Sequence, residues 1–231
     1  MDPYYQAEGI TLFYGDAANM VPRLGRFGLL LTDPPYGINH DRDKGASSVG
    51  RRSNLGPAKA WDVKRWDKSP PDRWVLEMMV SRADQSIIWG GNFMRLPPTA
   101  GWLVWDKDNS GDFADAELAW TNIDMPVRKL TYRWNGMIQQ DMKNKETKWH
   151  PAQKPLALMR WCIGHATSPL SILDPYCGSG STLIAARDLG IQAIGIEADK
   201  DYCDIVVERL KERVLPLYGP LRPEAEEELL V

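Results

Sequence analysis

The sequence has few cysteines and no long apolar run. Its three cysteines, Cys162, Cys177 and Cys203, show no Cys-x-x-Cys spacing and no histidine cluster near them, so neither a disulfide framework nor a zinc site is indicated. Apolar stretches such as 27–31 and 86–89 are far too short to span a bilayer, and the amino terminus has neither a basic leader nor an apolar signal region. We therefore expect a soluble, cytoplasmic protein with reduced thiols, no metal and no membrane partner.

An excess of positive charge is also missing, because the 231 residues carry a formal net charge of −3. Charge acts locally, within about 8 Å at physiological salt, so its distribution matters more than the sum. Residues 41–73 contain nine basic and five acidic side chains, and residues 128–160 contain eight and two. The tail, 214–231, is acidic at Glu224, Glu226, Glu227 and Glu228. The sequence therefore predicts two basic segments that the acidic tail masks in the total.

Short apolar runs that end at turn or polar residues recur along the chain. We interpret six of them as buried strands: 10–14, 28–31, 86–89, 102–105, 171–173 and 193–196. Segments with helical spacing lie between them, at 72–83 and 202–214. This alternation predicts an α/β, Rossmann-like, doubly wound and mainly parallel sheet, and the 43% apolar composition favours one domain over residues 1–231.

A glycine-rich turn begins at Asp174, where the sequence reads Asp-Pro-Tyr-Cys-Gly-Ser-Gly-Ser-Thr. Gly178 and Gly180 permit a tight turn and a close backbone approach, and the helix that follows offers free N–H groups. The next strand ends in Glu197, whose carboxylate can accept both ribose hydroxyls of a nucleoside cofactor. A nicotinamide site is the nearest alternative, although Leu183 replaces the third glycine of Gly-x-Gly-x-x-Gly. A turn that binds no ligand also stays open.

The segment Asp33-Pro34-Pro35-Tyr36 ends another apolar run. Its two prolines remove two backbone donors and fix φ, so the segment projects carbonyl groups. The Asp33 carboxylate and the Pro34 carbonyl can orient both N–H bonds of a flat amine such as adenine N6 and localise its lone pair for attack on a methyl sulfonium. Tyr36 would stack on a base that has left the duplex. A proline turn with a solvated Asp33 is the alternative. A metal role is disfavoured because no acids or histidines cluster beside Asp33.

With these two motifs the sequence resembles the amino-group DNA methyltransferases, in the circularly permuted arrangement in which Asp-Pro-Pro-Tyr precedes the cofactor glycines. The resemblance covers roughly residues 9–39, 86–122 and 149–213. It implies the S-adenosylmethionine-dependent methyltransferase fold, with Asp33 to Tyr36 holding the target base. It implies S-adenosyl-L-methionine as cofactor, bound by Asp16, Asp33, Gln153, Lys154, Asp174, Tyr176, Gly178, Gly180, Ser181, Thr182, Glu197 and Ala198.

The resemblance extends to three further segments. His150 to Pro155 looks like the family's segment before the first cofactor strand. Pro155 fits the first turn of a helix whose free N–H groups, with Lys154, would face the cofactor carboxylate. Trp89 to Phe93 and Ala116 to Trp120 are similar to family elements at the base pocket, although aromatic residues in such places are often core.

The Asp-first motif favours adenine. We therefore expect a methyltransferase that modifies adenine N6 within a specific sequence of double-stranded DNA. Cytosine N4 remains an alternative because both chemistries need the same clamp. Two others are an inactive DNA-binding or regulatory protein that retains the cofactor pocket, and amino methylation of RNA or protein.

Two polar stretches interrupt the alternation, and long loops are often functional. Residues 39–71 form a basic loop, and residues 123–149 are the predicted target-recognition segment between core regions 9–122 and 150–213. The recognition segment is small, so we expect a short target or help from a second subunit in a homodimer. Side chains suited to phosphates and base edges are Arg51, Arg52, Arg128, Lys129, Arg133, Lys143, Lys145 and Lys148. A solvated basic loop is the alternative.

Overall fold

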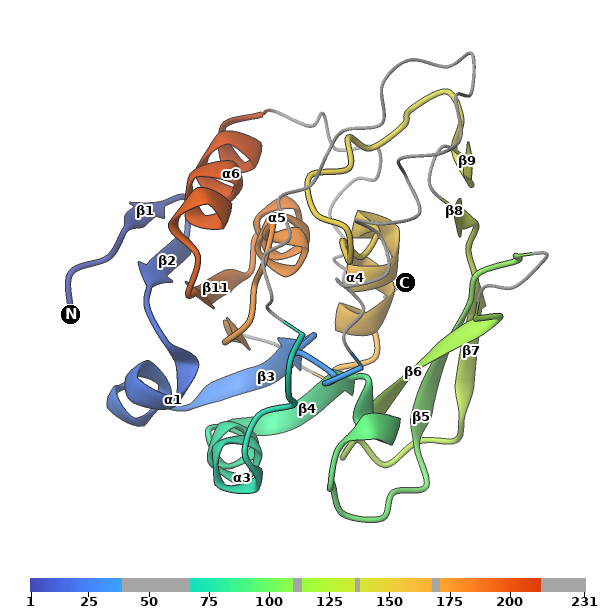
Figure 1. Cartoon of the computed structure of the whole chain (residues 1–231), viewed down its shortest axis with the longest axis horizontal. Coiled ribbons are helices and arrows are strands. Elements are labelled where there is room, and N and C mark those ends of the chain that lie inside the picture. The colour runs from blue at the N-terminus through green and yellow to red at the C-terminus, as the bar shows by residue number, and fades with distance from the viewer. Residues whose placement is uncertain (39–66, 110–113, 136–137, 168–170, 213–231) are drawn as a thin grey trace, which may run out of the picture.

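The computed structural model describes residues 1–38, 67–109, 114–135, 138–167 and 171–212 (Figure 1). Within them one sheet of nine strands runs in the order β1-β2-β11-β10-β3-β4-β6-β5-β7, and β8 and β9 pair separately. The strands are β1 (Tyr5–Ala7), β2 (Ile10–Tyr14), β3 (Phe27–Thr32), β4 (Ala83–Trp89), β5 (Trp102–Asp106), β6 (Ala116–Thr121), β7 (Arg128–Thr131), β8 (Trp134–Asn135), β9 (Ile138–Gln139), β10 (Ser171–Asp174) and β11 (Gln192–Glu197). The helices are α1 (Ala17–Met20), η1 (Val21–Arg23), α3 (Arg73–Ser81), η2 (Gly91–Phe93), α4 (Leu156–Ile163), α5 (Ser181–Asp188) and α6 (Lys200–Lys211).

The middle of the sheet joins strands from opposite parts of the chain. β10 and β11 pair in parallel with each other, and they lie between β2 and β3, which also pair in parallel with them. β4 continues the parallel set beside β3, whereas β6 runs antiparallel to both β4 and β5. The predicted α/β fold with a doubly wound, mainly parallel centre is confirmed, and each of the six predicted strands is present.

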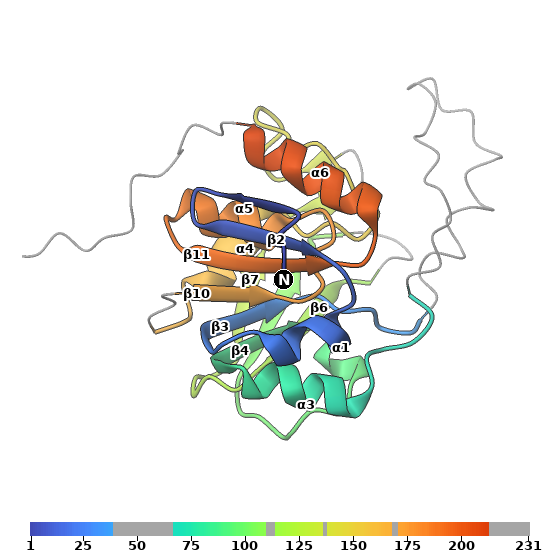
Figure 2. The same ribbon diagram turned by 90° about the vertical axis from the view of Figure 1, so that its left-hand side faces the viewer.

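Helices cover both faces of the sheet (Figures 1 and 2). Leu29 and Leu31 of β3 belong to a core cluster with residues of α4, α5 and α6. Leu30, which points the other way, belongs to a second cluster with Val75 and Met79 of α3. A strand buried on both faces needs apolar residues at successive positions. This explains why β3 is an uninterrupted apolar run.

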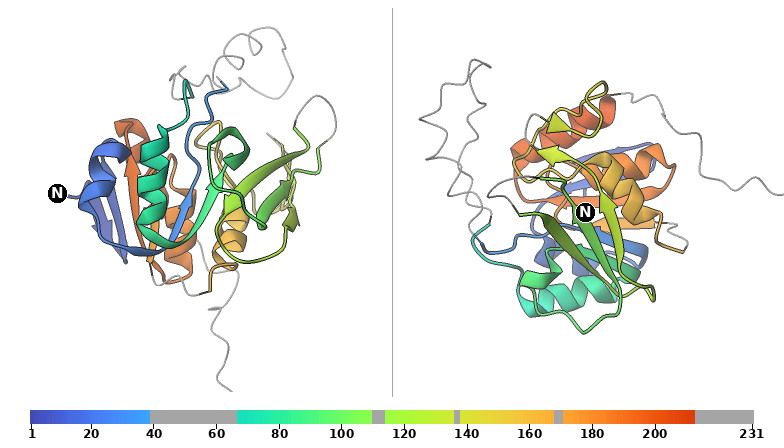
Figure 3. Two further views of the ribbon diagram at one scale, coloured as in Figure 1. Left: turned by 90° about the horizontal axis from the view of Figure 1, so that it is seen from below. Right: turned by 90° about the vertical axis from the view of Figure 1, so that its right-hand side faces the viewer.

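The far end of the sheet differs from the expectation for residues 123–149. This stretch contains β7, which pairs in parallel with β5 at the edge of the sheet, and the β8–β9 hairpin (Figure 3). The edge position tolerates exposed basic side chains, which keep such strands from pairing with other chains. The predicted basic loop, with Arg51 and Arg52, and the acidic tail lie largely outside the described residues.

No helix in the described ranges is both long and apolar enough to cross a membrane.

Candidate active site

The two sequence motifs meet at the carboxyl ends of β3 and β10. These strands are parallel neighbours, with Leu29 opposite Ile172 and Leu30 opposite Leu173. The Thr32 hydroxyl, just before Asp33, donates to the Asp174 carboxylate at 2.8 Å. From this point the chain winds outward in both directions, through β11 and through β4. Such a switch in strand order is where α/β sheets bind their ligands.

Four charged side chains alternate in sign beside the Asp-Pro-Pro-Tyr segment. Lys154 Nζ lies 2.5 Å from Asp33 Oδ2 and 3.1 Å from Glu117 Oε2. Glu117 also forms an ion pair with Lys107. The Tyr36 hydroxyl donates to Asp33 Oδ1 at 2.5 Å. The Lys154 side chain is 7% exposed and that of Asp33 is 23% exposed, so the carboxylate remains within reach of a ligand while the ammonium group is enclosed.

Burial and charge act in opposite directions on the pKa values of this cluster. Burial raises the pKa of Asp33, and the Lys154 ammonium opposes this rise. Burial would also raise the pKa of Glu117, but Lys154 and Lys107 outweigh it and lower the pKa to about 2. Burial alone would lower the pKa of Lys154, yet its two carboxylate partners raise it. Lys154 and Glu117 therefore stay charged, and burial raises the pKa of Tyr36, so its hydroxyl keeps its proton.

Several contacts fix the aromatic end of the segment. The Asp67 carboxylate accepts hydrogen bonds from the backbone N–H groups of Tyr36 and Gly37, both at 2.7 Å. The Tyr36 ring lies over Gly90, where an added Cβ would come within 2.1 Å of the ring and where φ is +69°. Only glycine fits there. The Tyr36 ring also stacks on Phe93, with ring centroids 5.2 Å apart and planes inclined by 16°.

The two glycines of the cofactor motif have different surroundings. The Gly178 N–H donates to Glu197 Oε2 at 2.9 Å, and an added Cβ at Gly178 would meet no atom within 4 Å. At Gly180 an added Cβ would lie 3.0 Å from Val206 of α6. Gly178 thus leaves room for a ligand, whereas Gly180 permits close packing of α5 against α6.

Both acids on the cofactor side have raised pKa values because they are buried. Glu197 also accepts the Asp199 N–H at 2.8 Å, yet burial raises its pKa to about 7. Asp174 accepts Thr32 Oγ1 and the Tyr176 N–H, and burial raises its pKa to about 6. These carboxylates are close to their titration points at neutral pH.

The other predicted cofactor residues surround the turn with differing access. Asp16 caps α1 from an exposed position, and Ala198 is exposed in the bend after β11. Tyr176 is half-buried, which raises its pKa to about 12. Thr182 is buried in the first turn of α5. The Gln153 amide is already bonded to the backbone of Trp149 and Thr147.

Two side chains bond to the backbone at and just after Lys154. Ser181, at the start of α5, donates its hydroxyl to the Lys154 carbonyl at 2.8 Å. The N–H of Leu156, two residues after Lys154, donates to the Glu146 carboxylate at 3.0 Å, and this bond caps α4. Pro155 lies at the N-cap position of α4. The Lys154 ammonium therefore points to Asp33 and Glu117, a direction that the sequence did not predict.

Two residues of the site were missed by the sequence. Asp67 was counted only as one charge of a basic segment, and Lys107 only follows a predicted strand. Their partners are far away in sequence, so no local pattern identifies them. Glu117 and Phe93 lie in the two segments that resemble base-pocket elements, which is the signal that could have singled them out.

The predicted DNA-contacting residues that are described lie on β7, between β7 and β8, and after β9. All are exposed except Lys148, which is half-buried. Lys129 and Arg133 form ion pairs with Asp106 and Asp108, which neutralise part of their charge. Two hydrogen bonds of 2.8 Å between the Gln139 amide and the Glu146 backbone join the hairpin to the loop that leads to α4.

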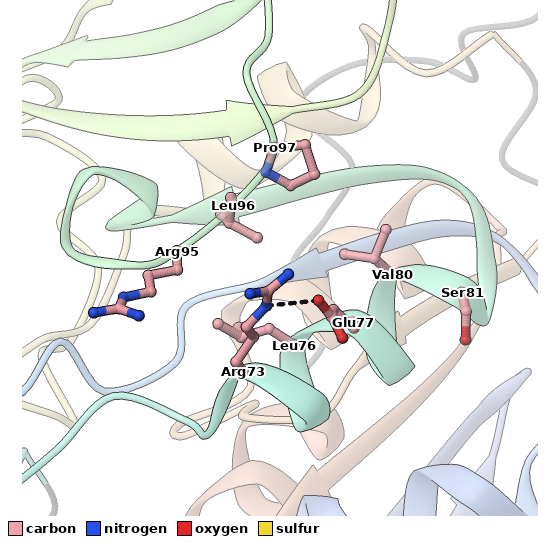
Figure 4. Close-up of a pocket in the computed structure, with 8 residues that line it drawn as sticks. All are labelled: Arg73, Leu76, Glu77, Val80, Ser81, Arg95, Leu96 and Pro97. Carbon is pink, nitrogen blue, oxygen red and sulfur yellow. Dashed lines mark hydrogen bonds and ion pairs between the residues drawn. The ribbon is translucent and has the colours of Figure 1, made fainter.

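A separate groove lies between α3 and residues 95–97 (Figure 4). Its volume is about 570 Å³, and its lining includes Leu76, Val80 and Leu96. The Arg73–Glu77 ion pair of 2.8 Å lies along it. It contains no residue of the two motifs. Within the described ranges, no three His, Cys, Asp or Glu side chains gather in a way that could hold a metal ion.

Comparison with known proteins defines the class. The DNA methylase family, which comprises the N6 and N4 enzymes, matches residues 59–208. The chain belongs to this family, so the predicted resemblance to the amino-group DNA methyltransferases is confirmed, while the circularly permuted arrangement stays a prediction.

Three relatives of this chain are Type II methyltransferases, and each aligns with it over most of its own length. M2.DpnII of Streptococcus pneumoniae is 40% identical over 90% of this chain and 92% of that protein. M.Cfr9I of Citrobacter freundii is 32% identical over 89% of each. M.ScaI of Streptomyces caespitosus is 27% identical over 94% of this chain and 86% of that protein.

Two solved structures share the fold. The complex of M1.HpyAVI with SAM superposes with a TM-score of 0.54 at 21% identity, covering 87% of this chain and all of that chain (100%). The PvuII DNA methyltransferase, which is cytosine-N4-specific, gives a TM-score of 0.59 at 14% identity over 92% of this chain and 90% of that chain.

Proposed function

We propose that this DNA methyltransferase modifies adenine N6, with Asp33, Pro34 and Tyr36 as the clamp for a base flipped out of the duplex. The observation that carries the proposal is the contact between the two motifs. Thr32, which precedes the clamp, is bonded to Asp174, which begins the cofactor turn. The Asp-first motif is the basis for adenine rather than cytosine.

The residues present fit S-adenosyl-L-methionine, the cofactor of this enzyme. Gly178 offers its backbone beside open space, and Glu197 presents a carboxylate next to it. We propose that Glu197 accepts the ribose hydroxyls and that the remaining predicted residues of the turn surround the cofactor. When bound, the cofactor supplies an electrophilic methyl carbon on a sulfonium.

The clamp acts on the attacking amine. Each oxygen of Asp33 carries two acceptor sites, so the carboxylate can accept an amine N–H while it keeps its bonds to Lys154 and Tyr36. The Pro34 carbonyl can accept the second N–H. With both N–H bonds held, the nitrogen lone pair would be free to attack the methyl group, and the sulfonium of the cofactor would leave as a neutral thioether. The nitrogen would then carry an extra proton, which the Asp33 carboxylate that already accepts one N–H could take.

Stacking holds the base in the same place. Tyr36 and Phe93 lie almost parallel at 5.2 Å, and we propose that the base occupies the space between them once the rings part. Stacking on an aromatic ring contributes about 1–3 kcal/mol per base. This offsets much of the few kcal/mol that flipping costs.

We propose that the basic side chains from Arg128 to Lys148 contact the DNA, with those near the hairpin contributing to sequence choice. Their exposure at one end of the sheet supports this role. Replacing residues 123–149 with the corresponding segment of a relative should change the methylated sequence. An unchanged sequence would contradict the assignment.

The substitution Asp33→Ala tests the clamp. Removing a preorganised group that acts on the transition state costs about 10²–10³-fold in kcat, and we expect at least this loss with little change in cofactor affinity. Methyl transfer to duplex DNA and calorimetric cofactor binding measure the two quantities. Long-read modification sequencing of DNA from a methylation-free host that expresses the wild-type chain identifies the base. Methylated cytosine would refute adenine, and an active alanine variant would refute the clamp.

A further inference from the structure

The ion pairs around Asp33 form a continuous chain of alternating charge that the methylation chemistry described so far leaves unused. It runs from Asp33 through Lys154 and Glu117 to Lys107. The four residues come from four places: the end of β3, the loop before α4, β6 and the residue after β5. An arrangement assembled from separate segments fixes each side chain by tertiary contacts.

Aromatic rings lie close to the two lysine cations of this series of ion pairs. Lys154 Nζ lies 5.7 Å from the Tyr36 ring centroid and 5.8 Å from that of Trp89. Lys107 Nζ lies 4.9 Å from the Trp105 centroid. Aromatic faces attract cations and exclude water. Charges in such surroundings are screened less than charges on the surface.

Asp33 needs an ionised carboxylate for the role proposed above, because a protonated carboxyl offers fewer acceptor sites to the amine. Its surroundings oppose ionisation, since it is largely removed from water and since Glu117 and Asp174 are nearby carboxylates. Among the described residues that act on it, the Lys154 ammonium is the cation, and Tyr36 supplies a neutral donor. A buried acid without its cation would take up a proton.

We propose that Lys154, held in place by Glu117, is a positioning residue that keeps the Asp33 carboxylate ionised and oriented towards the target amine. The inference rests on the proposed role of Asp33. Lys154 bonds to Oδ2 while Tyr36 bonds to Oδ1, so the plane of the carboxylate is fixed at both oxygens. Glu117 forms a second ion pair with the Lys154 ammonium and is itself paired with Lys107.

The test is the pH dependence of methyl transfer at saturating cofactor and DNA. In Lys154→Met the acidic limb of the rate profile should move to higher pH by about 1–3 units, the usual effect of a close opposite charge. The rate should recover as pH rises above the new limb. Lys154→Arg keeps the charge and should leave the limb close to its wild-type position.

Two control variants grade the effect by distance. Lys107→Met removes a lysine charge that contacts Glu117 rather than Asp33. It should therefore move the acidic limb less than Lys154→Met. Lys211→Met, on the exposed end of α6, should leave it unmoved. If Lys154→Met does not fold, Glu117→Gln is compared with Lys154→Met/Glu117→Gln. These two variants differ only at position 154, and the acidic limb should again lie at higher pH in the double variant.

Three results would overturn the inference: equal activity of Lys154→Met and wild type, a loss of the same factor at every pH, or a weaker cofactor affinity with an unmoved limb. The last would assign Lys154 to the cofactor, as the sequence resemblance implies. Asp33→Ala is measured in parallel. Loss of activity in that variant with an unmoved limb in Lys154→Met overturns only the inference, whereas an active Asp33→Ala overturns the clamp itself.

Discussion

The proposed base side and cofactor side of the site both use buried or half-buried carboxylates, but the charges of these carboxylates have different partners. On the base side, Asp33 and Glu117 share Lys154, and Glu117 has Lys107 as well. On the cofactor side, the partners described for Asp174 and Glu197 are neutral hydroxyl and backbone N–H groups. The pKa of Glu117 is accordingly lowered to about 2, and that of Glu197 is raised to about 7.

The difference matches the charge of what each side has to bind. Under the proposed function the base side binds a neutral amine, so an acid that accepts its N–H has to be ionised by the protein's own cations. The cofactor brings a sulfonium and an ammonium group. An acid near the cofactor can therefore be ionised by the positive charge that the ligand brings. Among the described residues, lysine cations pair with the acids of the base side, whereas Asp174 and Glu197 form no ion pair and the Arg209 guanidinium contacts the Ser179 backbone of the turn instead.

The sharpest way to break this comparison is Glu197→Ala. If Glu197 accepts the ribose hydroxyls, its loss removes two hydrogen bonds to a charged group, each worth about 1.5–3 kcal/mol. We expect cofactor affinity to fall by at least about 10²-fold, measured by calorimetry. The methylation rate at saturating cofactor should change far less than in Asp33→Ala.

The two alanine variants thus predict opposite patterns, with affinity lost in one and turnover lost in the other. Glu197→Gln serves as the conservative control, because it keeps the shape and one acceptor oxygen. A Glu197→Ala enzyme that binds the cofactor with wild-type affinity would show that the two sides are not separated in this way.

The pH dependence of cofactor binding gives the next largest effect. With a pKa of about 7 in the free protein, Glu197 is protonated below neutrality and must lose its proton to accept both hydroxyls. Affinity should therefore fall towards tenfold per pH unit as the pH drops below about 7. In Glu197→Gln this dependence should flatten, and a wild-type affinity that is constant across neutrality would contradict the shifted pKa.

The stability of the cofactor-free protein should have the opposite pH dependence to the cofactor affinity, because it should fall as the pH rises. The pKa values of Glu197 and Asp174 are higher in the folded than in the unfolded chain, so their contribution is fully present below their unfolded values. It is lost as pH rises through about 6 for Asp174 and about 7 for Glu197. The melting temperature without cofactor should therefore fall across this interval by less in Glu197→Gln than in wild type, as differential scanning calorimetry can measure.

The sequence predicted elements whose signal is local. β3, β10 and β11 are apolar runs buried on both faces, and each was recognised. β7 was not, because Arg128, Lys129 and Thr131 are exposed and an edge strand needs no apolar run. Its place in the sheet comes from pairing with β5, which a single segment does not encode.

The same limit applies to the site. Asp33, Tyr36, Gly178 and Glu197 were identified because their motifs are contiguous. Lys154 was expected to face the cofactor, whereas its ammonium lies between Asp33 and Glu117. A motif places a residue near a site, but the direction of a long side chain depends on charges supplied by distant segments.

The smallest effects are expected from alanine substitutions at the two glycines of the cofactor turn, which should differ in stability and in cofactor affinity. Both have positive φ, +52° at Gly178 and +82° at Gly180, so alanine at either position costs roughly 1–3 kcal/mol of stability from the backbone alone. At Gly180 the added Cβ also presses on Val206 of α6 at 3.0 Å. Gly180→Ala should therefore have the lower melting temperature of the two.

Gly178→Ala should instead have the lower cofactor affinity, because its Cβ would enter the open space beside the Glu197 carboxylate. We expect a several-fold weaker affinity, measured by calorimetry at a temperature where both variants are folded. Equal affinities in the two variants would mean that the cofactor does not approach Gly178. The space beside this glycine would then have to be assigned to another part of the ligand path, and Glu197 would remain the test of where the ribose lies.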